Sequence, residues 1–214
     1  SSDLKFQAKL AALMSATPTA TMLTPGLCAA YQTRVQRFAG TAGVHTLALV
    51  KAEPDSGAAR SGAALFSTTA EAFFANHSLM EELFGPATLL VECSSRQQML
   101  QAANLVEGQL TATIHAGKDE SAGMDELVER LAVKAGRLVF NGFPTGVEVA
   151  HAMTHGGPYP ATSDGRSTSV GTRAIERFLR PVSYQNFPDA SLPAELQESN
   201  PLKLKRLVDG SQQV

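Results

Sequence analysis

The chain has 214 residues, 18% of them charged and 43% hydrophobic, and a formal net charge of −2 at pH 7. This is the composition of an ordinary globular protein, so we expect neither disorder nor the basic surface of a nucleic-acid-binding protein. No apolar run approaches the roughly 18 residues of a membrane-spanning helix. Residues 1–5 do not resemble a secretory signal, and two cysteines, Cys28 and Cys93, are too few for a disulfide framework. We therefore expect a cytoplasmic protein without a membrane or nucleic-acid partner.

The first part of the sequence predicts two helices. Residues 4–14 carry apolar side chains loosely on one side, and Pro18 ends this helix because proline cannot continue it. Thr24 suits the N-cap of a second helix, and Pro25 suits its first position. Apolar residues then recur about once per turn as far as Phe38, which indicates one buried helix face.

Two short apolar runs follow, at residues 45–50 and 63–66, and both are typical of strands. The segment between them contains a polar turn at 53–57 with proline, aspartate and glycine. We therefore expect a hairpin or an adjacent strand pair.

From residue 85 onward the pattern alternates between strands and helices. The strands are expected at residues 88–93, 110–114 and 137–141. Ser94 or Ser95 can cap the helix after the first strand, and we expect Gly136 to stop the second helix. This order implies right-handed crossovers. It predicts an α/β fold of three layers, with helices on both faces of a mainly parallel sheet.

Residues 142–171 contain so many glycines and prolines that they exclude a long helix or strand. A loop this long is usually functional, and it follows the carboxyl end of a parallel strand, where open α/β sheets place their sites. A short helix is expected at 173–178. Residues 180–185 then predict a C-terminal edge strand, because Pro181 is tolerated only at an edge or a strand start. The tail from Pro188 is polar and predicts a solvated surface.

Side-chain chemistry alone indicates no complete active site. The sequence has no phosphate-binding G-x-G-x-x-G or Walker motif and no G-x-S-x-G elbow. Cys28 lies early in a predicted helix and Cys93 ends a predicted strand, where cysteines are more often small buried residues than nucleophiles. Glu148, His151 and His155 could share one helix face as metal ligands. The glycines that follow argue against that helix, so we expect no metal site.

Four segments together match the motif order of one enzyme family. They are Glu-Glu-Leu-Phe-Gly-Pro at 81–86, His-Gly-Gly-Pro-Tyr-Pro-Ala-Thr at 155–162, Ser-Thr-Ser-Val-Gly at 167–171 and Arg-Phe-Leu-Arg-Pro-Val-Ser-Tyr-Gln at 177–185. Their order and spacing over most of the chain resemble the aldehyde dehydrogenase superfamily. Within it they resemble the branch of α-ketoglutaric semialdehyde (2,5-dioxovalerate) dehydrogenases and related fatty-aldehyde dehydrogenases.

The resemblance implies two cofactor-binding residues and a loop on the substrate side. Glu82 matches the glutamate that hydrogen-bonds the ribose hydroxyls beside the nicotinamide of NAD or NADP, and Phe84 matches the aromatic residue near that ring. The loop beside the aldehyde tunnel would contain His155, Gly156, Pro158 and Tyr159. Without the resemblance, Phe84 would be interpreted as a core residue and Glu82 as a surface carboxylate, and the glycines and prolines as shaping the backbone.

The catalytic residues of the family have no counterpart in this chain. The family's nucleophilic cysteine lies in a G-Q-x-C sequence, whereas Cys28 follows Pro-Gly-Leu and Cys93 follows Val-Glu. No segment matches the family's general base, its oxyanion asparagine or its nucleotide-binding domain, and in family order all of them precede residue 1. The resemblance therefore implies a C-terminal part, with residues 1–178 from the catalytic domain and 179–214 as an oligomerisation strand and tail.

The sequence leaves three functional hypotheses. The first is a C-terminal fragment of an NAD(P)⁺-dependent aldehyde dehydrogenase that oxidises an aldehyde or semialdehyde, with α-ketoglutaric semialdehyde as a candidate substrate. Such a fragment needs the rest of its own chain, forms a homo-oligomer and is inactive alone. The second is a truncated paralogue that acts as a non-catalytic binding or assembly module, for which an unpaired edge strand would be suited. The third is a hydrolase that uses Cys28 or the pair His151 and His155.

Overall fold

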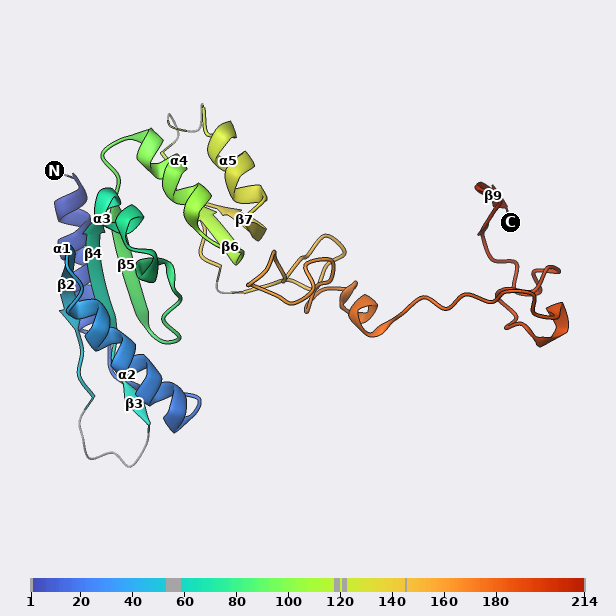
Figure 1. Ribbon diagram of the computed structural model, residues 1–214, viewed down its shortest axis with the longest axis horizontal. Helices are drawn as coiled ribbons and strands as arrows, with labels where there is room; N and C mark the ends of the chain where they lie inside the picture. Colours follow the sequence, from blue (N-terminus) through green and yellow to red (C-terminus); the bar gives the residue numbers. More distant parts are fainter. Residues whose placement is uncertain (1, 53–58, 118–119, 121–122, 145, 214) are drawn as a thin grey trace. The chain divides into compact units, whose positions relative to one another are not determined.

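The computed structural model describes residues 2–52, 59–117, 120, 123–144 and 146–213. They form two compact units, divided between residues 174 and 175 (Figure 1). The polar turn expected at 53–57 lies outside the described residues. No helix in the described part of the chain is long and apolar enough to cross a membrane.

Two helices open the first unit, as the sequence predicts. Helix α1 spans Ser2–Ser15 and helix α2 spans Pro25–Ala39. The Thr24 hydroxyl oxygen accepts a hydrogen bond from the Leu27 amide at 3.1 Å, which confirms the predicted N-cap. Because this cap and the proline at the first helical position are local signals, the start of α2 could be read from the sequence.

A three-stranded sheet carries the larger hydrophobic core. Its strands are β2 (Val44–Leu49), β4 (Ala64–Thr69) and β5 (Ala87–Glu92). Strand β4 lies in the centre, antiparallel to β2 and parallel to β5, which confirms the expected strand pair. Figure 1 shows α1 behind this sheet and α2 in front of it, so helices cover both faces. A separate short ladder joins β1 (Ala20–Thr21) to β3 (Arg60–Ser61).

The apolar face of α2 packs on this sheet, and the segment between β4 and β5 packs against the same core. Between β4 and β5 the chain forms helix α3 (Ala70–Ala75) and the 3₁₀ turn η1 (His77–Met80). The buried core is drawn from α2, β4, α3 and η1: Tyr31, Val35, Phe38, Ala64, Phe66, Phe73 and Leu79. Asn76 caps η1 by accepting hydrogen bonds from the amide and hydroxyl of Ser78. After η1 the chain lies beside α2, where Glu81 contacts Arg37.

The remaining strands and helices of the first unit form a second, parallel pair. Its elements are α4 (Arg96–Leu105), β6 (Gln109–Ile114), α5 (Asp125–Ala132) and β7 (Ala135–Phe140). Ser95 is the residue that caps α4, with its hydroxyl 3.3 Å from the Gln98 amide. Among the described strands β5 pairs with β4 and β6 with β7, so the parallel ladders belong to two sheets and not to one. The α/β class is confirmed.

Gly136 does not have the role that its position after a helix predicts. It lies inside β7, and α5 already ends at Ala132. A Cβ atom on Gly136 would overlap the carbonyl oxygen of Gly156 and would lie 2.6 Å from its carbonyl carbon. The glycine is therefore explained by the close approach of another backbone segment and not by a helix stop.

The second unit contains little regular structure. It begins within the 3₁₀ turn η3 (Ala174–Phe178), where a short helix was expected, and includes η4 (Asp189–Ser191). Residues 180–185 do not form the expected edge strand. They are exposed and lie outside every strand of the described chain. A strand needs a hydrogen-bonded neighbour, and Pro181 has no N–H to offer one.

An unpredicted hairpin ends the second unit. Strand β8 (Arg206–Val208) pairs antiparallel with β9 (Ser211–Gln213). Asp209 and Gly210 connect them with φ angles of 50° and 78°. Asp-Gly is a preferred pair for such a two-residue turn, so the sequence does contain this signal.

Candidate cofactor site

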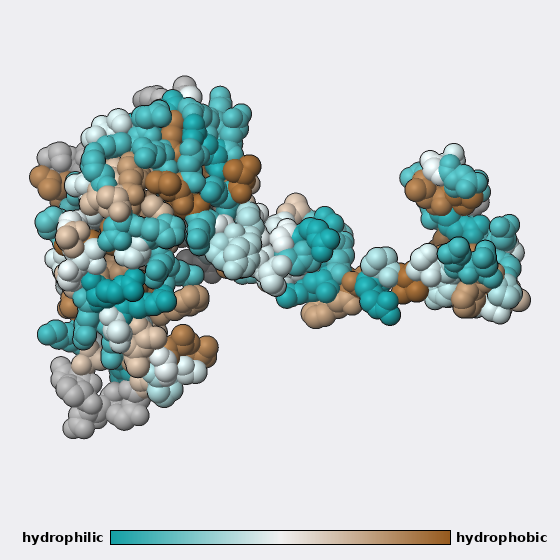
Figure 2. Space-filling model, in the orientation of Figure 1, coloured by the Kyte–Doolittle hydropathy of each residue, from teal (hydrophilic) through white to brown (hydrophobic). Residues whose placement is uncertain are grey.

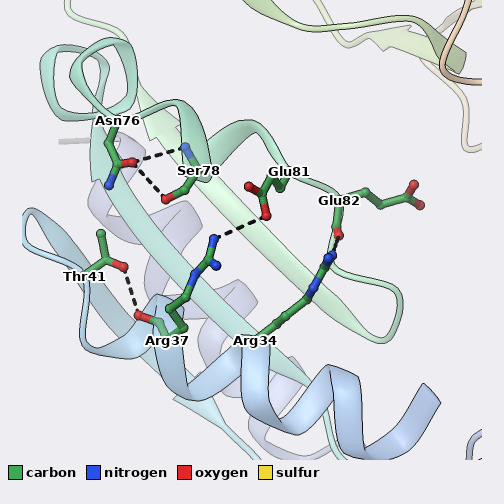
Figure 3. Close-up of polar contacts among 7 residues, drawn as sticks. All are labelled: Arg34, Arg37, Thr41, Asn76, Ser78, Glu81 and Glu82. Carbon is green, nitrogen blue, oxygen red and sulfur yellow. Dashed lines mark hydrogen bonds and ion pairs between the residues drawn. The ribbon is translucent and has the colours of Figure 1, made fainter. Parts of the chain in front are cut away.

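The loop 81–86, which connects η1 to β5, is held on α2 by two arginines (Figure 3). The Arg34 Nη1 atom donates a hydrogen bond to the main-chain carbonyl of Glu82 at 2.8 Å. One helical turn later, Arg37 forms an ion pair with the Glu81 carboxylate, with 3.2 Å between Nη2 and Oε2. Both arginines are exposed, so these contacts add little to the stability of the fold.

Tyr31 holds the far end of the same loop from inside the core. Its hydroxyl group lies 3.0 Å from the carbonyl oxygen of Gly62 and 3.2 Å from that of Pro86. Burial raises the pKa of Tyr31 to about 12, because the charged phenolate would lose its hydration. A Cβ atom on Gly85 would lie 2.6 Å from Cε2 of this ring and closer still to Cδ2, so glycine is required by the tyrosine beneath it.

These attachments leave two side chains of the loop free to meet a ligand. Leu83 packs against the core cluster, whereas the ring of Phe84 is 61% exposed. Figure 3 shows the Glu82 carboxylate directed away from Arg34 and Arg37, while the Glu81 carboxylate turns toward Arg37. Phe84 is therefore not part of the hydrophobic core formed by the described residues. The structure places the two residues expected to bind cofactor on the open side of an anchored loop.

The loop with the candidate substrate-side residues does not stay at the carboxyl end of β7. It starts there, but a Cβ atom on Gly108 would lie 2.6 Å from the carbonyl carbon of Pro158. The close approach between Gly136 and Gly156 lies at the same end of the β6–β7 pair. Residues 156–158 thus pack against the amino ends of both strands, contrary to the expectation from α/β topology.

Hydrogen bonds fix this fold-back. The Arg137 side chain of β7 donates to the carbonyl oxygens of Gly146, at 2.8 Å, and Pro144, at 3.3 Å. The His155 amide donates to the hydroxyl oxygen of Thr168 at 2.8 Å. The strand order predicts that this loop lies open at the carboxyl end of β7. Residues 156–158 instead pack closely at the amino ends of β6 and β7, and hydrogen bonds hold the loop there.

Exposure differs among the four candidate substrate-side residues. Gly156 is buried, His155 and Pro158 are partly buried, and Tyr159 is 84% exposed. The described residues provide no hydrogen bond or ion pair that joins this loop to loop 81–86.

Neither cysteine has the surroundings of an activated thiol. Cys28 is buried, and its sulfur lies 3.2 Å from the hydroxyl oxygen of Ser61 and 3.4 Å from the carbonyl oxygen of Arg60. Cys93 is exposed, but partial burial of its sulfur and the negative charge of Glu71 raise the pKa of this thiol. A raised pKa disfavours the thiolate that a nucleophilic cysteine needs, so the surroundings of Cys93 do not activate it.

Metal-binding residues are not gathered in the described part of the chain. Within residues 2–52, 59–117, 120, 123–144 and 146–213, no three His, Cys, Asp or Glu side chains could hold an ion together. His151 instead places its Nδ1 atom 2.9 Å from the hydroxyl of Thr172.

One curated relative matches almost the whole chain, and another matches about three fifths of it. An "Alpha-ketoglutaric semialdehyde dehydrogenase 2" of Azospirillum brasilense is 45% identical over 206 residues, which are 96% of this chain and 39% of that protein. An "Alpha-ketoglutaric semialdehyde dehydrogenase" of Acinetobacter baylyi is 53% identical over 135 residues, or 63% of this chain and 26% of that protein. The chain thus spans about two fifths or less of the length of these relatives. No protein-family model matches it.

Solved structures share the fold at low sequence identity. The salicylaldehyde dehydrogenase of Pseudomonas putida G7, complexed with salicylaldehyde, gives a TM-score of 0.61 at 16% identity over 86% of this chain and 38% of its own. The Delta-pyrroline-5-carboxylate dehydrogenase of Mycobacterium tuberculosis, bound with NAD, gives 0.55 at 18% identity over 80% of this chain and 31% of its own. By sequence and fold together, the chain belongs to the aldehyde dehydrogenase superfamily and is related to the alpha-ketoglutaric semialdehyde dehydrogenases.

Proposed function

We propose that this chain is the C-terminal part of an NAD(P)⁺-dependent aldehyde dehydrogenase and supplies part of its cofactor pocket. The substrate we propose is an aldehyde or semialdehyde, in particular α-ketoglutaric semialdehyde, which the enzyme oxidises to a carboxylic acid. The observation that carries this proposal is the loop 81–86. Its backbone is anchored on α2, while the Glu82 carboxylate and the Phe84 ring remain open to a ligand.

The two open side chains fit the nicotinamide end of a dinucleotide. A carboxylate only accepts hydrogen bonds and has two oxygens, so Glu82 can bind both hydroxyls of one ribose. The exposed apolar ring of Phe84 can pack near the nicotinamide and exclude water there. The bound dinucleotide supplies the hydride acceptor that aldehyde oxidation requires. Glu82 and Phe84 therefore orient the cofactor and take no part in proton transfer.

We place the nucleophile, the general base and the nucleotide-binding domain in polypeptide outside these 214 residues. The neutral partners of Cys28 and the raised pKa of Cys93 support this assignment. Exposed apolar residues also support it, because a covering segment would remove them from water (Figure 2, brown). In the first unit they include Phe140, Phe143 and Val149.

On the substrate side, we assign different tasks to the four loop residues. Tyr159 is the most exposed of them and is suited to contact the aldehyde. His155 and Pro158 hold the loop in place, and buried Gly156 allows the close approach to β7. We further propose a cytoplasmic homo-oligomer in which the exposed residues 180–185 gain a strand partner from another subunit.

A pair of neighbouring substitutions tests the cofactor role in the full-length gene product. Glu82→Gln weakens the acceptor of the ribose hydroxyls, so the KM for NAD(P)⁺ should rise about tenfold. Glu81→Gln removes the ion pair with Arg37 but leaves Glu82 intact, and should keep that KM within about twofold. Equal cofactor KM values for the two variants would show that Glu82 does not bind the ribose.

A further inference from the structure

We propose that Arg34 of α2 is a positioning residue for the cofactor, because it holds the peptide group attached to the Cα atom of Glu82. This inference rests on the cofactor role proposed for Glu82. Arg34 itself need not touch the cofactor. Its guanidinium binds the main chain of loop 81–86, with 2.8 Å between Nη1 and the carbonyl oxygen of Glu82.

Three α2 residues contact the loop, and Arg34 is the one that binds the main chain at Glu82. Tyr31, Arg34 and Arg37 are three residues apart and therefore lie along one side of the helix. Tyr31 binds the carbonyl of Pro86 and is buried, so its role belongs to the fold. Arg37 binds a side chain, that of Glu81, which can move without moving the backbone. Arg34 binds the peptide group of Glu82 itself (Figure 3).

Peptide geometry turns this contact into an orientation. The carbonyl of Glu82, its Cα atom and the amide of Leu83 lie in one plane, because the peptide bond does not rotate freely. Arg34 fixes the oxygen of this plane, and the packing of the Leu83 side chain on the core fixes its other end. With both ends held, the Cα atom of Glu82 keeps its position, and its Cα–Cβ bond can turn only by rotation about the Cα–C bond. Loss of Arg34 frees one end, and the carboxylate then samples orientations that miss the ribose.

We expect the contact between Arg34 and the Glu82 carbonyl to affect cofactor affinity more than folding stability. A guanidinium bound to a carbonyl is a charge-assisted hydrogen bond, which is stronger than a neutral one. Arg34 is exposed, so its substitution leaves no buried cavity and should leave the melting temperature nearly unchanged. An effect on cofactor binding without an effect on folding therefore distinguishes positioning from a structural role.

The test uses three variants of the full-length gene product. Arg34→Gln should raise the KM for NAD(P)⁺ about three- to tenfold, with the KM for the aldehyde and the melting temperature unchanged. Arg34→Lys keeps a cationic donor and should recover part of this loss. Arg37→Gln is the matched control, since it removes the same charge from the same helix side without touching the Glu82 carbonyl. It should leave the cofactor KM within about twofold.

The outcomes separate this inference from the proposed function. If Glu82→Gln raises the cofactor KM but Arg34→Gln does not, Glu82 binds cofactor and the positioning role of Arg34 is wrong. Equal effects of Arg34→Gln and Arg37→Gln also overturn it, because the effect would then be one of charge. If Glu82→Gln itself has no effect, the proposed cofactor role fails first. A cofactor-specific rise with Arg34→Gln and partial rescue by lysine supports both.

Discussion

Replacement of Gly85 by alanine tests whether Tyr31 shapes the cofactor loop. The added Cβ atom would lie 2.6 Å from Cε2 and 2.8 Å from Cγ of the Tyr31 ring. Carbon atoms in contact are normally about 3.5–4.0 Å apart, so the ring or the loop must move by about 1 Å. The ring cannot move freely, since it is 3% exposed and its hydroxyl is bound to two carbonyl groups.

Such overpacking costs about 1–3 kcal/mol of the free energy of unfolding. For a protein of this size, a loss of about 2 kcal/mol lowers the melting temperature by about 4–8 °C. Gly26→Ala is the matched control, because its nearest neighbour would be the Thr24 hydroxyl oxygen at 3.9 Å within the start of α2. Urea unfolding followed by circular dichroism measures both variants. An unfolding free energy of Gly85→Ala equal to that of Gly26→Ala would refute the steric argument.

Two further predictions concern titratable groups. Tyr31 has its pKa raised from 10.0 to about 12 in the folded protein, so its contribution to stability is present below pH 10 and is lost as the pH rises toward 12. Tyr31→Phe should cost about 1–2 kcal/mol of the free energy of unfolding at neutral pH and should remove its decrease between pH 10 and pH 12. Unfolding curves at several pH values measure both effects. An equal decrease in the wild type and the variant would contradict the prediction. Glu71 helps to raise the pKa of Cys93, so Glu71→Gln should speed alkylation of Cys93, with buried Cys28 as the slow internal reference. Equal Cys93 alkylation rates with and without Glu71 would show that its charge does not reach the thiol.

Local signals explain which elements the sequence predicts. The start of α2 follows from Thr24 and Pro25, and the cap of α4 from Ser95, since each of these residues acts on the next few amides. Pairing and close packing depend on residues far away in the chain. Gly136 resembles a helix stop until the backbone of Gly156 is placed beside it.

In the candidate site, too, local sequence predicts some features, and contacts between distant residues determine the others. Motif resemblance finds the loop 81–86, but its supports Tyr31 and Arg34 lie about 50 residues earlier and carry no motif of their own. Their three-residue spacing on one helix is a weak signal that becomes meaningful once the loop is seen beside α2. The fold-back of residues 156–158 onto the amino ends of β6 and β7 depends on backbone approach, which strand order does not encode.

In the function that we propose, this chain supplies one part of an aldehyde dehydrogenase, and polypeptide outside these 214 residues supplies the catalytic residues. The most direct measurement is the reduction of NAD⁺ and NADP⁺ with α-ketoglutaric semialdehyde, followed by the absorbance of the reduced nicotinamide. We predict that the full-length gene product reduces at least one of the two cofactors and that the purified 214-residue chain reduces neither. Turnover by the 214-residue chain alone, or none by the full-length product, would contradict this account.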